Sequence, residues 1–227
     1  MTMSSIIVLD GVKKIYKMGD TELEALSNSN VEIEDGEFVA VMGPSGSGKS
    51  TLMNMIGALD TPTTGDVNVG GEKISNFSQD ELAMLRSKKI GFIFQQFNLI
   101  PSMNAAENVA LPMLFTGAKK KKRNKRAEML LEKVGLGERL NHMPSELSGG
   151  QRQRVSIARA LANNPDIILA DEPTGNLDSE TGENVMNLLT ELNREGKTIV
   201  MVTHDENDAE YADRVIKIED GKTGVEQ

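Results

Sequence analysis

The chain has 227 residues, of which 38% are hydrophobic and 26% charged, and this composition indicates a folded globular protein with a hydrophobic core. It contains no cysteine, which excludes disulfide bonds and thiolate metal sites and is compatible with a reducing cytoplasm. The net charge of −9 argues against a general nucleic-acid-binding protein. The apolar stretch near the start is too short for a signal peptide, and no apolar run approaches the roughly 18 residues of a membrane span. We therefore expect a chain that does not cross a bilayer by itself.

Strand patterns come first along the chain. Residues 5–16 and 28–43 have the composition of β-strands, with a turn at the sequence EDGE. A glycine-rich loop follows, and residues 49–60 predict a helix that ends before Pro62. Residues 78–89 then predict an amphipathic helix capped by Ser78 and followed by a short buried strand.

After Gln95 the pattern becomes helical, and no strand is expected before about Ser148. Residues 101–115 and 125–136 predict helices. In the second of these, one face collects apolar side chains at helical spacing, namely Ala127, Leu130, Leu131 and Val134. This segment is therefore predicted to be a helical insertion in an α/β core.

Strands and helices alternate again from Gly149 onwards. A helix that ends near Pro165 is followed by a continuous apolar strand over 166–171, of the kind found in buried parallel sheets. A predicted helix, strand, helix and strand follow at residues 179–196, 198–204, 205–213 and 214–221. This alternation predicts βαβ units and a mostly parallel sheet.

The glycine-rich loop matches the pattern G-x-x-x-x-G-K-[ST] and lies between a predicted strand and a predicted helix, as a phosphate-binding loop should. Backbone N–H groups and the helix N-terminus would hold phosphate oxygens. Lys49 would pair with the β- and γ-phosphates, and Ser50 would ligate Mg²⁺. An ordinary Gly/Ser-rich turn is the alternative. The predicted loop comprises Gly43, Pro44, Ser45, Gly46, Ser47, Gly48, Lys49, Ser50 and Thr51.

Two acidic residues end the apolar strand at 166–171. Asp171 has the position of the residue that supports the metal, and Glu172 could polarise an attacking water. Alone, these carboxylates could be an ordinary polar strand end, but the phosphate-binding loop favours the catalytic interpretation. His204 closes another apolar strand and could donate a hydrogen bond to a γ-phosphate, although its position alone favours a packed strand-end histidine.

A second glycine pair, in the sequence ELSGGQRQR, also precedes a helix. Ser148 is the predicted cap, and Gly149 and Gly150 would leave the N–H groups of the helix start accessible to an anion. This site has no lysine, no metal ligand and no base of its own, whereas the first loop would already surround one nucleotide. The reason for a second phosphate site is not evident from the residues alone.

Taken together, these motifs resemble the ATP-binding subunit of an ABC transporter over essentially the whole chain. The motifs are GPSGSGKST, FIFQQFNLIP with the Q-loop at Gln95, the signature LSGGQ, IILADE, the D-loop GNLDS and the switch histidine His204. The sequences DEPTGNLDS and GFIFQQFNLIPSMNAAENVALP resemble most the lipoprotein-release and macrolide-export branch. Ser156 departs from the alanine that is usual after QRQRV.

The resemblance implies an α/β P-loop NTPase (RecA-like) fold with a mostly parallel sheet, an N-terminal antiparallel β part and an inserted helical subdomain. It implies a single ABC ATPase domain, with the nucleotide-binding core at 1–95 and 153–227 and the helical subdomain with the signature at 96–152. Lipoprotein release, macrolide export and peptide export are the transport reactions it suggests.

The resemblance also assigns roles to residues. Tyr16, just after the first strand, would stack on adenine, the alternative being an exposed edge-strand tyrosine. Ser50 and Gln95 would ligate Mg²⁺, with Asp171 behind them. Glu172 would be the catalytic base, with Lys49, Gln95 and His204 as further catalytic residues. A second copy would complete the ATP site in trans through Ser148, Gly149, Gly150, Gln151 and Asp178.

The implied protein binds ATP and Mg²⁺, forms an ATP-sandwich homodimer, and drives an integral membrane permease from the cytoplasmic face of the membrane. An ABC protein acting on DNA or ribosomes is a second hypothesis, but such proteins carry a long coiled coil or two cassettes, and no nucleic-acid partner is expected here. A small-molecule P-loop kinase would leave LSGGQ unexplained.

One segment runs against the acidic composition. Residues 119–126, KKKKRNKR, carry seven positive charges, so the remaining chain stands at −16. A solvated helix start is the simplest interpretation. Contact with anionic lipid is the alternative, because polybasic segments are attracted to such membranes. The run contains no aromatic residue that could stack on bases, which argues against RNA.

Overall fold

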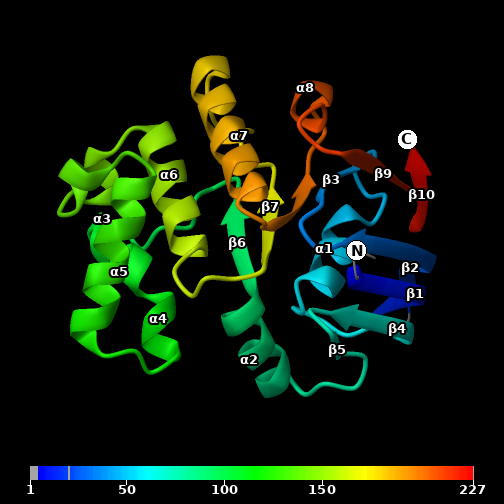
Figure 1. Ribbon diagram of the computed structural model, residues 1–227. Coiled ribbons are helices and arrows are strands. Elements are labelled where there is room, and N and C mark those ends of the chain that lie inside the picture. The colour runs from blue at the N-terminus through cyan, green and yellow to red at the C-terminus, as the bar shows by residue number, and fades with distance from the viewer. Residues whose placement is uncertain (1–4, 20, 227) are drawn as a thin grey trace. The chain divides into compact units, whose positions relative to one another are not determined.

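The computed structural model describes residues 5–19 and 21–226, and these form two compact units. The first unit comprises residues 1–86 and 193–227, and the second residues 87–192. Figure 1 shows their helices and strands. The predicted α/β class is confirmed, and the predicted bounds of the helical subdomain, 96–152, stay a prediction.

An antiparallel sheet with the order β2-β1-β4-β5 forms one part of the first unit. Its strands are β1 (Ser5–Met18), β2 (Thr21–Glu34), β4 (Thr64–Val69) and β5 (Glu72–Lys73). In β2 the side chains alternate between buried and exposed from Ser29 to Glu34, as expected for a strand with one face on a core. The predicted N-terminal antiparallel part is therefore confirmed.

Parallel pairing characterises the other sheet strands of the first unit. Here β3 (Phe38–Met42) pairs in parallel with β8 (Thr198–Val202) and with β9 (Arg214–Glu219). An antiparallel hairpin joins β9 to β10 (Lys222–Glu226). Phe38 to Val41 and all of β8 are buried, which explains why both strands are continuous apolar runs rather than alternating ones.

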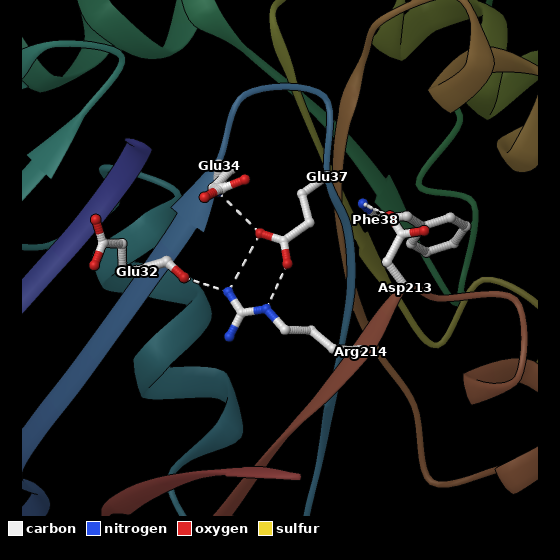
Figure 2. A network of polar contacts seen from close by, with 6 residues as sticks. All are labelled: Glu32, Glu34, Glu37, Phe38, Asp213 and Arg214. Atoms are coloured by element: carbon white, nitrogen blue, oxygen red, sulfur yellow. Dashed lines mark hydrogen bonds and ion pairs between the residues drawn. The ribbon is translucent and has the colours of Figure 1, made fainter. Parts of the chain in front are cut away.

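A polar network fixes the starts of β3 and β9 (Figure 2). The Arg214 guanidinium donates to the Glu37 carboxylate and to the Glu32 carbonyl, and Glu37 also accepts from the backbone N–H of Glu34 at 2.9 Å. Beside it, the Phe38 N–H donates to Asp213 at 2.9 Å. The carboxylate of Glu37 raises the pKa of the Arg214 guanidinium. The network thus connects the end of β2 to the start of β3 and to the start of β9.

The first unit also holds α1 (Lys49–Ile56), the start of α2 (Gln79–Lys89) and α8 (Glu206–Ala209). Helix α1 ends four residues before the predicted stop. Ala58 adopts a left-handed φ of 50°, and the N–H groups of Leu59 and Asp60 both turn back to the Asn54 carbonyl. A tight turn therefore replaces the last predicted helical residues.

In the second unit, β6 (Ile90–Phe94) and β7 (Ile167–Asp171) form a parallel pair. Residues 95–148 are all described and contain no strand, as predicted. Its helices are α3 (Ala105–Ala110), α4 (Pro112–Phe115), α5 (Lys120–Lys133), α6 (Gly149–Ala160) and most of α7 (Ser179–Arg194). Ala127, Leu130, Leu131 and Val134 are each at most 4% exposed, which confirms the predicted apolar face of α5.

Within residues 5–19 and 21–226, no helix combines the length and the apolar character that a membrane span needs.

Candidate nucleotide-binding site

The predicted phosphate-binding loop lies between β3 and α1, as its motif requires. Gly46 and Gly48 adopt left-handed φ values of 79° and 109°, which glycine reaches at little cost. Gly48 is the N-cap of α1 and makes no side-chain cap, so the first N–H groups of this helix lack an intrahelical partner. The loop therefore presents a helix N-terminus of the kind that binds phosphate.

Two glycines of this loop lie against the backbone of other strands. A Cβ on Gly43 would lie 2.1 Å from the Ile218 carbonyl oxygen, and one on Gly48 would lie 2.6 Å from that of Ala25. No side chain of any size fits at these distances. The two glycines are thus required by close packing as well as by the loop conformation.

The side chains of the loop suit a phosphate ligand. Lys49 Nζ donates to the carbonyls of Gly43 and Pro44, at 2.6 and 2.8 Å, which holds the ammonium group over the loop. Ser47 Oγ is buried and has no hydrogen-bond partner within the described part of the chain. A buried hydroxyl without a partner is costly, and a phosphate oxygen would satisfy it. Ser50, the predicted Mg²⁺ ligand, is exposed.

Two residues that support the loop were missed by the sequence reasoning. Gly221, in the turn between β9 and β10, donates its N–H to the Ser47 carbonyl at 2.9 Å. The Gly221 carbonyl accepts from Ser29 Oγ at 2.7 Å and from the Ser27 N–H at 2.8 Å. Ser29 is fully buried. Gly221 therefore connects the phosphate loop to β2. In the sequence, the only sign of this connection was a serine, Ser29, within a predicted strand.

Tyr16 lies inside β1, not just after it as predicted, because that strand continues to Met18. Its hydroxyl donates to Asp60 at 3.3 Å, and Lys14 Nζ lies 5.1 Å from its ring centroid. Lys14 also pairs with Asp60 at 2.6 Å. These contacts fix the half-buried ring, while adenine stacking stays a prediction.

His204 follows β8 after one residue, Thr203, and its side chain is exposed. A packed strand-end histidine, which the position alone favoured, would be buried. The imidazole is therefore accessible to a ligand.

In the second unit, the register of β6 and β7 brings two predicted residues to one edge. Phe94 pairs with Asp171, so Gln95 and Glu172 both leave the strand pair at the same end. Glu172 adopts a left-handed φ of 43°, which is rare for a residue with a side chain. Such backbone strain is often retained at functional sites.

The loop after β7 contacts Gln95 directly. Asn176 Nδ2 donates to the Gln95 carbonyl at 2.8 Å, and a Cβ on Gly175 would lie 2.6 Å from Gln95 Nε2. The buried Gln153 of α6 holds the same loop by donating to the Pro173 carbonyl at 2.5 Å. The Q-loop and the D-loop region are therefore linked within this unit.

Arg159 is a further residue that the sequence reasoning missed. Phe97 and Asn98, just after Gln95, have φ values of 59° and 49°, and the Arg159 guanidinium donates to both of their carbonyls, at 2.7 Å for Phe97. Arg159 also donates to the buried Ser156 hydroxyl at 3.3 Å. Burial lowers the pKa of Arg159. The turn after Gln95 is thus held by α6.

The signature segment forms the start of α6, as predicted. Ser148 is the N-cap, with its hydroxyl accepting from the Gln151 N–H at 3.3 Å and its own N–H donating to the Gln151 side chain at 3.0 Å. This capping box orients Ser148. A Cβ on Gly150 would lie 2.2 Å from Thr181 Cγ2, so α6 and α7 approach closely at this point.

Asp178 caps α7. It accepts from the Thr181 N–H at 3.0 Å and from the Thr181 hydroxyl at 2.8 Å, and these bonds lower the pKa of the Asp178 carboxyl. The predicted pairing of Asp178 across a dimer therefore concerns a carboxylate that already has an intrachain role.

A phosphate-binding loop between a parallel strand and a helix defines the class of this protein as a P-loop nucleoside triphosphatase. Residues 26–175 match the family described as ABC transporter, and this share of the chain shows that the protein belongs to that family. The predictions of an ABC-type ATPase and of its fold are confirmed.

Curated relatives extend over nearly the full chain. The ABC transporter ATP-binding protein MJ0796 of Methanocaldococcus jannaschii is 56% identical over 98% of this chain and 97% of its own length. YknY of Bacillus subtilis is 53% identical over 95% of this chain and 94% of its own length. The macrolide export ATP-binding/permease protein MacB of Wolinella succinogenes is 54% identical over 96% of this chain, which corresponds to 34% of MacB.

A solved structure is similar as well. The dimeric post-hydrolysis state of the ATP-binding cassette MJ0796 with ADP and Pi has a TM-score of 0.89 and 52% identity, covering 97% of this chain and 98% of that one.

Proposed function

We propose that this chain hydrolyses ATP as one half of a homodimer and drives a separate permease in the membrane, in lipoprotein release, macrolide export or peptide export. The observation that carries the proposal is the presence in one chain of two glycine-rich helix starts of different kinds, each suited to an anion. The first has Lys49 beside it, whereas the second is capped by Ser148 and has no acidic residue in its first turn. Two chains that face each other would complete two equivalent sites.

The similarity to MacB supports the permease partner. MacB is an ATP-binding/permease protein, and this chain corresponds to about a third of it. The remaining two thirds of MacB would then correspond to the permease. The solved MJ0796 dimer with ADP and Pi supports both the dimer and the hydrolysis reaction.

Residues of several motifs would divide the chemistry. Lys49 and the N–H groups of the loop would neutralise the β- and γ-phosphates, and His204 would donate to the γ-phosphate. Glu172 would accept a proton from the attacking water, whose oxygen would bond to the γ-phosphorus as the bond to the bridging oxygen breaks, giving ADP and phosphate. In trans, Ser148, Gly149, Gly150 and Gln151 would contact the same γ-phosphate, with Asp178 at the dimer interface.

Mg²⁺ would be held by the Ser50 hydroxyl and the Gln95 side chain, with Asp171 behind them. A hydroxyl, an amide oxygen and a carboxylate are the oxygen donors that this cation prefers. When bound, it would neutralise charge on the phosphates. Gln95 would also transmit nucleotide state to the helical subdomain, because its carbonyl and the turn that follows it are held by Asn176 and Arg159.

The Glu172→Gln variant tests this proposal. Glutamine preserves the shape of the side chain but cannot accept a proton, so we expect hydrolysis to fall by about 10²–10⁴-fold while ATP binding is kept. With hydrolysis blocked, gel filtration in ATP should show a dimer, and gel filtration in ADP should show a monomer. Turnover near the wild-type rate would refute the assignment of the base, and an ATP-bound monomer would refute the paired sites.

A further inference from the structure

The basic run at 119–126 contains two kinds of cation. Arg123 donates to the Ala118 carbonyl at 3.2 Å, and Arg126 donates to the Leu161 carbonyl at 3.3 Å, so both arginines support the local fold. The lysines differ. All five are exposed and make no ion pair or side-chain hydrogen bond with any residue that the structure describes; they are Lys119, Lys120, Lys121, Lys122 and Lys125.

These lysines are unfavourable for the helix that carries them. Lys119 is the N-cap of α5 and makes no side-chain cap, and the first turn of α5 has no acidic residue. Positive charges at a helix N-terminus oppose the helix dipole, and like charges three or four residues apart repel each other. The buried face of α5 would anchor the helix without them. The stability of α5 therefore does not explain why these lysines are present. Contact with another molecule would explain them.

Exposed apolar side chains lie next to this charge. In α4, Leu114 is 49% exposed and Phe115 is 79% exposed. The chain returns directly to α5 through the Gly117 N–H bond to Leu114 and the Ala118 N–H bond to Met113, at 3.1 and 3.2 Å. Leu114 and Lys120 also line one groove. Basic side chains beside an exposed aromatic ring are characteristic of proteins that lie on a membrane surface.

We propose that the five lysines, with Leu114 and Phe115, form a docking surface for anionic phospholipid. The ammonium groups would pair with headgroup phosphates, and the Phe115 ring would enter the interface. The rest of the chain carries −16 and would be repelled by such a membrane, so this surface would approach it first. The inference rests on the proposed function in one respect, because a permease partner would bring the chain to the membrane.

Vesicle sedimentation with the purified full-length chain tests the proposal without any need for hydrolysis. At low ionic strength we expect binding to vesicles of phosphatidylcholine with phosphatidylglycerol, weak binding to phosphatidylcholine alone, and release by salt, which screens the attraction. Replacing Lys119, Lys120, Lys121 and Lys122 with glutamine should weaken binding about tenfold or more. The thermal midpoint should stay the same or rise, because a repulsive cluster is removed from the helix start.

A matched control removes the same charge elsewhere. Glutamine at Lys17, Lys73, Lys217 and Lys222, all exposed in the first unit, should leave vesicle binding nearly unchanged. The Phe115→Ser variant should weaken binding to the anionic vesicles by loss of apolar insertion. Three outcomes would overturn the proposal. The control could lose as much binding as the variant at residues 119–122, that variant could bind fully, or the chain could bind equally to both kinds of vesicle. Displacement of the chain from vesicles by RNA at equal phosphate concentration would also overturn it.

ATPase activity in solution separates this inference from the proposed function. It should be unchanged in the variant at residues 119–122, because these lysines have no role in hydrolysis. If the chain hydrolyses ATP but does not bind anionic vesicles, the proposed docking surface alone is refuted. A chain that binds the vesicles but does not hydrolyse ATP would refute the proposed function alone.

Discussion

The Ser156 hydroxyl and the Arg159 guanidinium act together on the turn that follows Gln95. A left-handed pair such as Phe97 and Asn98 is strained for residues other than glycine and persists when other contacts fix it. The guanidinium can bond both carbonyls at once because its donors are held in a planar fork. The Ser156 hydroxyl accepts a hydrogen bond from the same guanidinium and so helps to orient it.

We expect the Ser156→Ala variant to lower kcat for ATP about fivefold, because one hydrogen bond contributes about 1 kcal/mol. Arg159→Lys should lower kcat further, since an ammonium group cannot replace the fork. The KM for ATP should change little in both, because neither residue belongs to the phosphate loop. Steady-state kinetics checks the split between kcat and KM. A lower melting temperature with unchanged kcat would show that the pair is only structural.

Residues of the phosphate loop and the signature could be predicted because each motif is local, and its glycines and serine act on backbone a few positions away. Ser29, Gly221 and Arg159 could not be predicted in the same way. Their partners are distant in the chain, and the reason for their residue types appears only when the strands and helices have come together.

The hairpin of β9 and β10 supports the phosphate loop at the scale of elements. Gly221 adopts a φ of 73°, and a Cβ there would lie 2.9 Å from the Ala25 carbonyl oxygen. Any side chain would therefore push the turn away from Ser47. Because the Gly221 N–H holds the Ser47 carbonyl, the conformation of the phosphate loop depends on this turn.

We expect the Gly221→Ala variant to raise the KM for ATP several-fold and to lose about 1 kcal/mol of stability from the left-handed backbone. Gly71→Ala is the control, because Gly71 has a similar φ of 84° and a Cβ there would meet no other atom within 4 Å. It should lose similar stability without any change in KM. Equal KM values in the two variants, measured by steady-state kinetics, would contradict a role for the turn in ATP binding.

Element boundaries were less predictable than element types. Strand β2 begins at Thr21, well before the predicted position, and the sequence did not indicate β4, β5 or β10. Those strands are short or rich in glycine, polar and acidic residues, and they form by pairing with neighbours that the local pattern does not reveal. The apolar strands β3, β7 and β8 were predictable because they are buried over most or all of their length.

For the molecule as a whole, the central question raised by the sequence was why one chain would have two phosphate sites. The capping box at Ser148 shows that the second helix start is a well-formed element. The proposed homodimer gives each signature segment a phosphate to bind.

The Ser148→Arg variant should therefore bind ATP normally but fail to dimerise in ATP, because a large cation would replace the cap at the proposed interface. Ser78→Arg is the matched control. Ser78 forms a similar reciprocal pair with Glu81 at the start of α2, so both variants lose a helix cap, at a cost of about 1 kcal/mol. Only the change at Ser148 should abolish the dimer in light-scattering measurements. Loss of the dimer in both would indicate a general effect of cap removal.

The contact between Gly221 and Ser47 also has a consequence for biosynthesis. Translation proceeds from the N-terminus, so the ribosome completes the phosphate loop long before it supplies the turn that holds the loop in place. A nascent chain from which Gly221 has not yet emerged would contain every residue of the loop motif without its support. ATP binding should thus be acquired late in synthesis, after most of the hydrophobic core has been made.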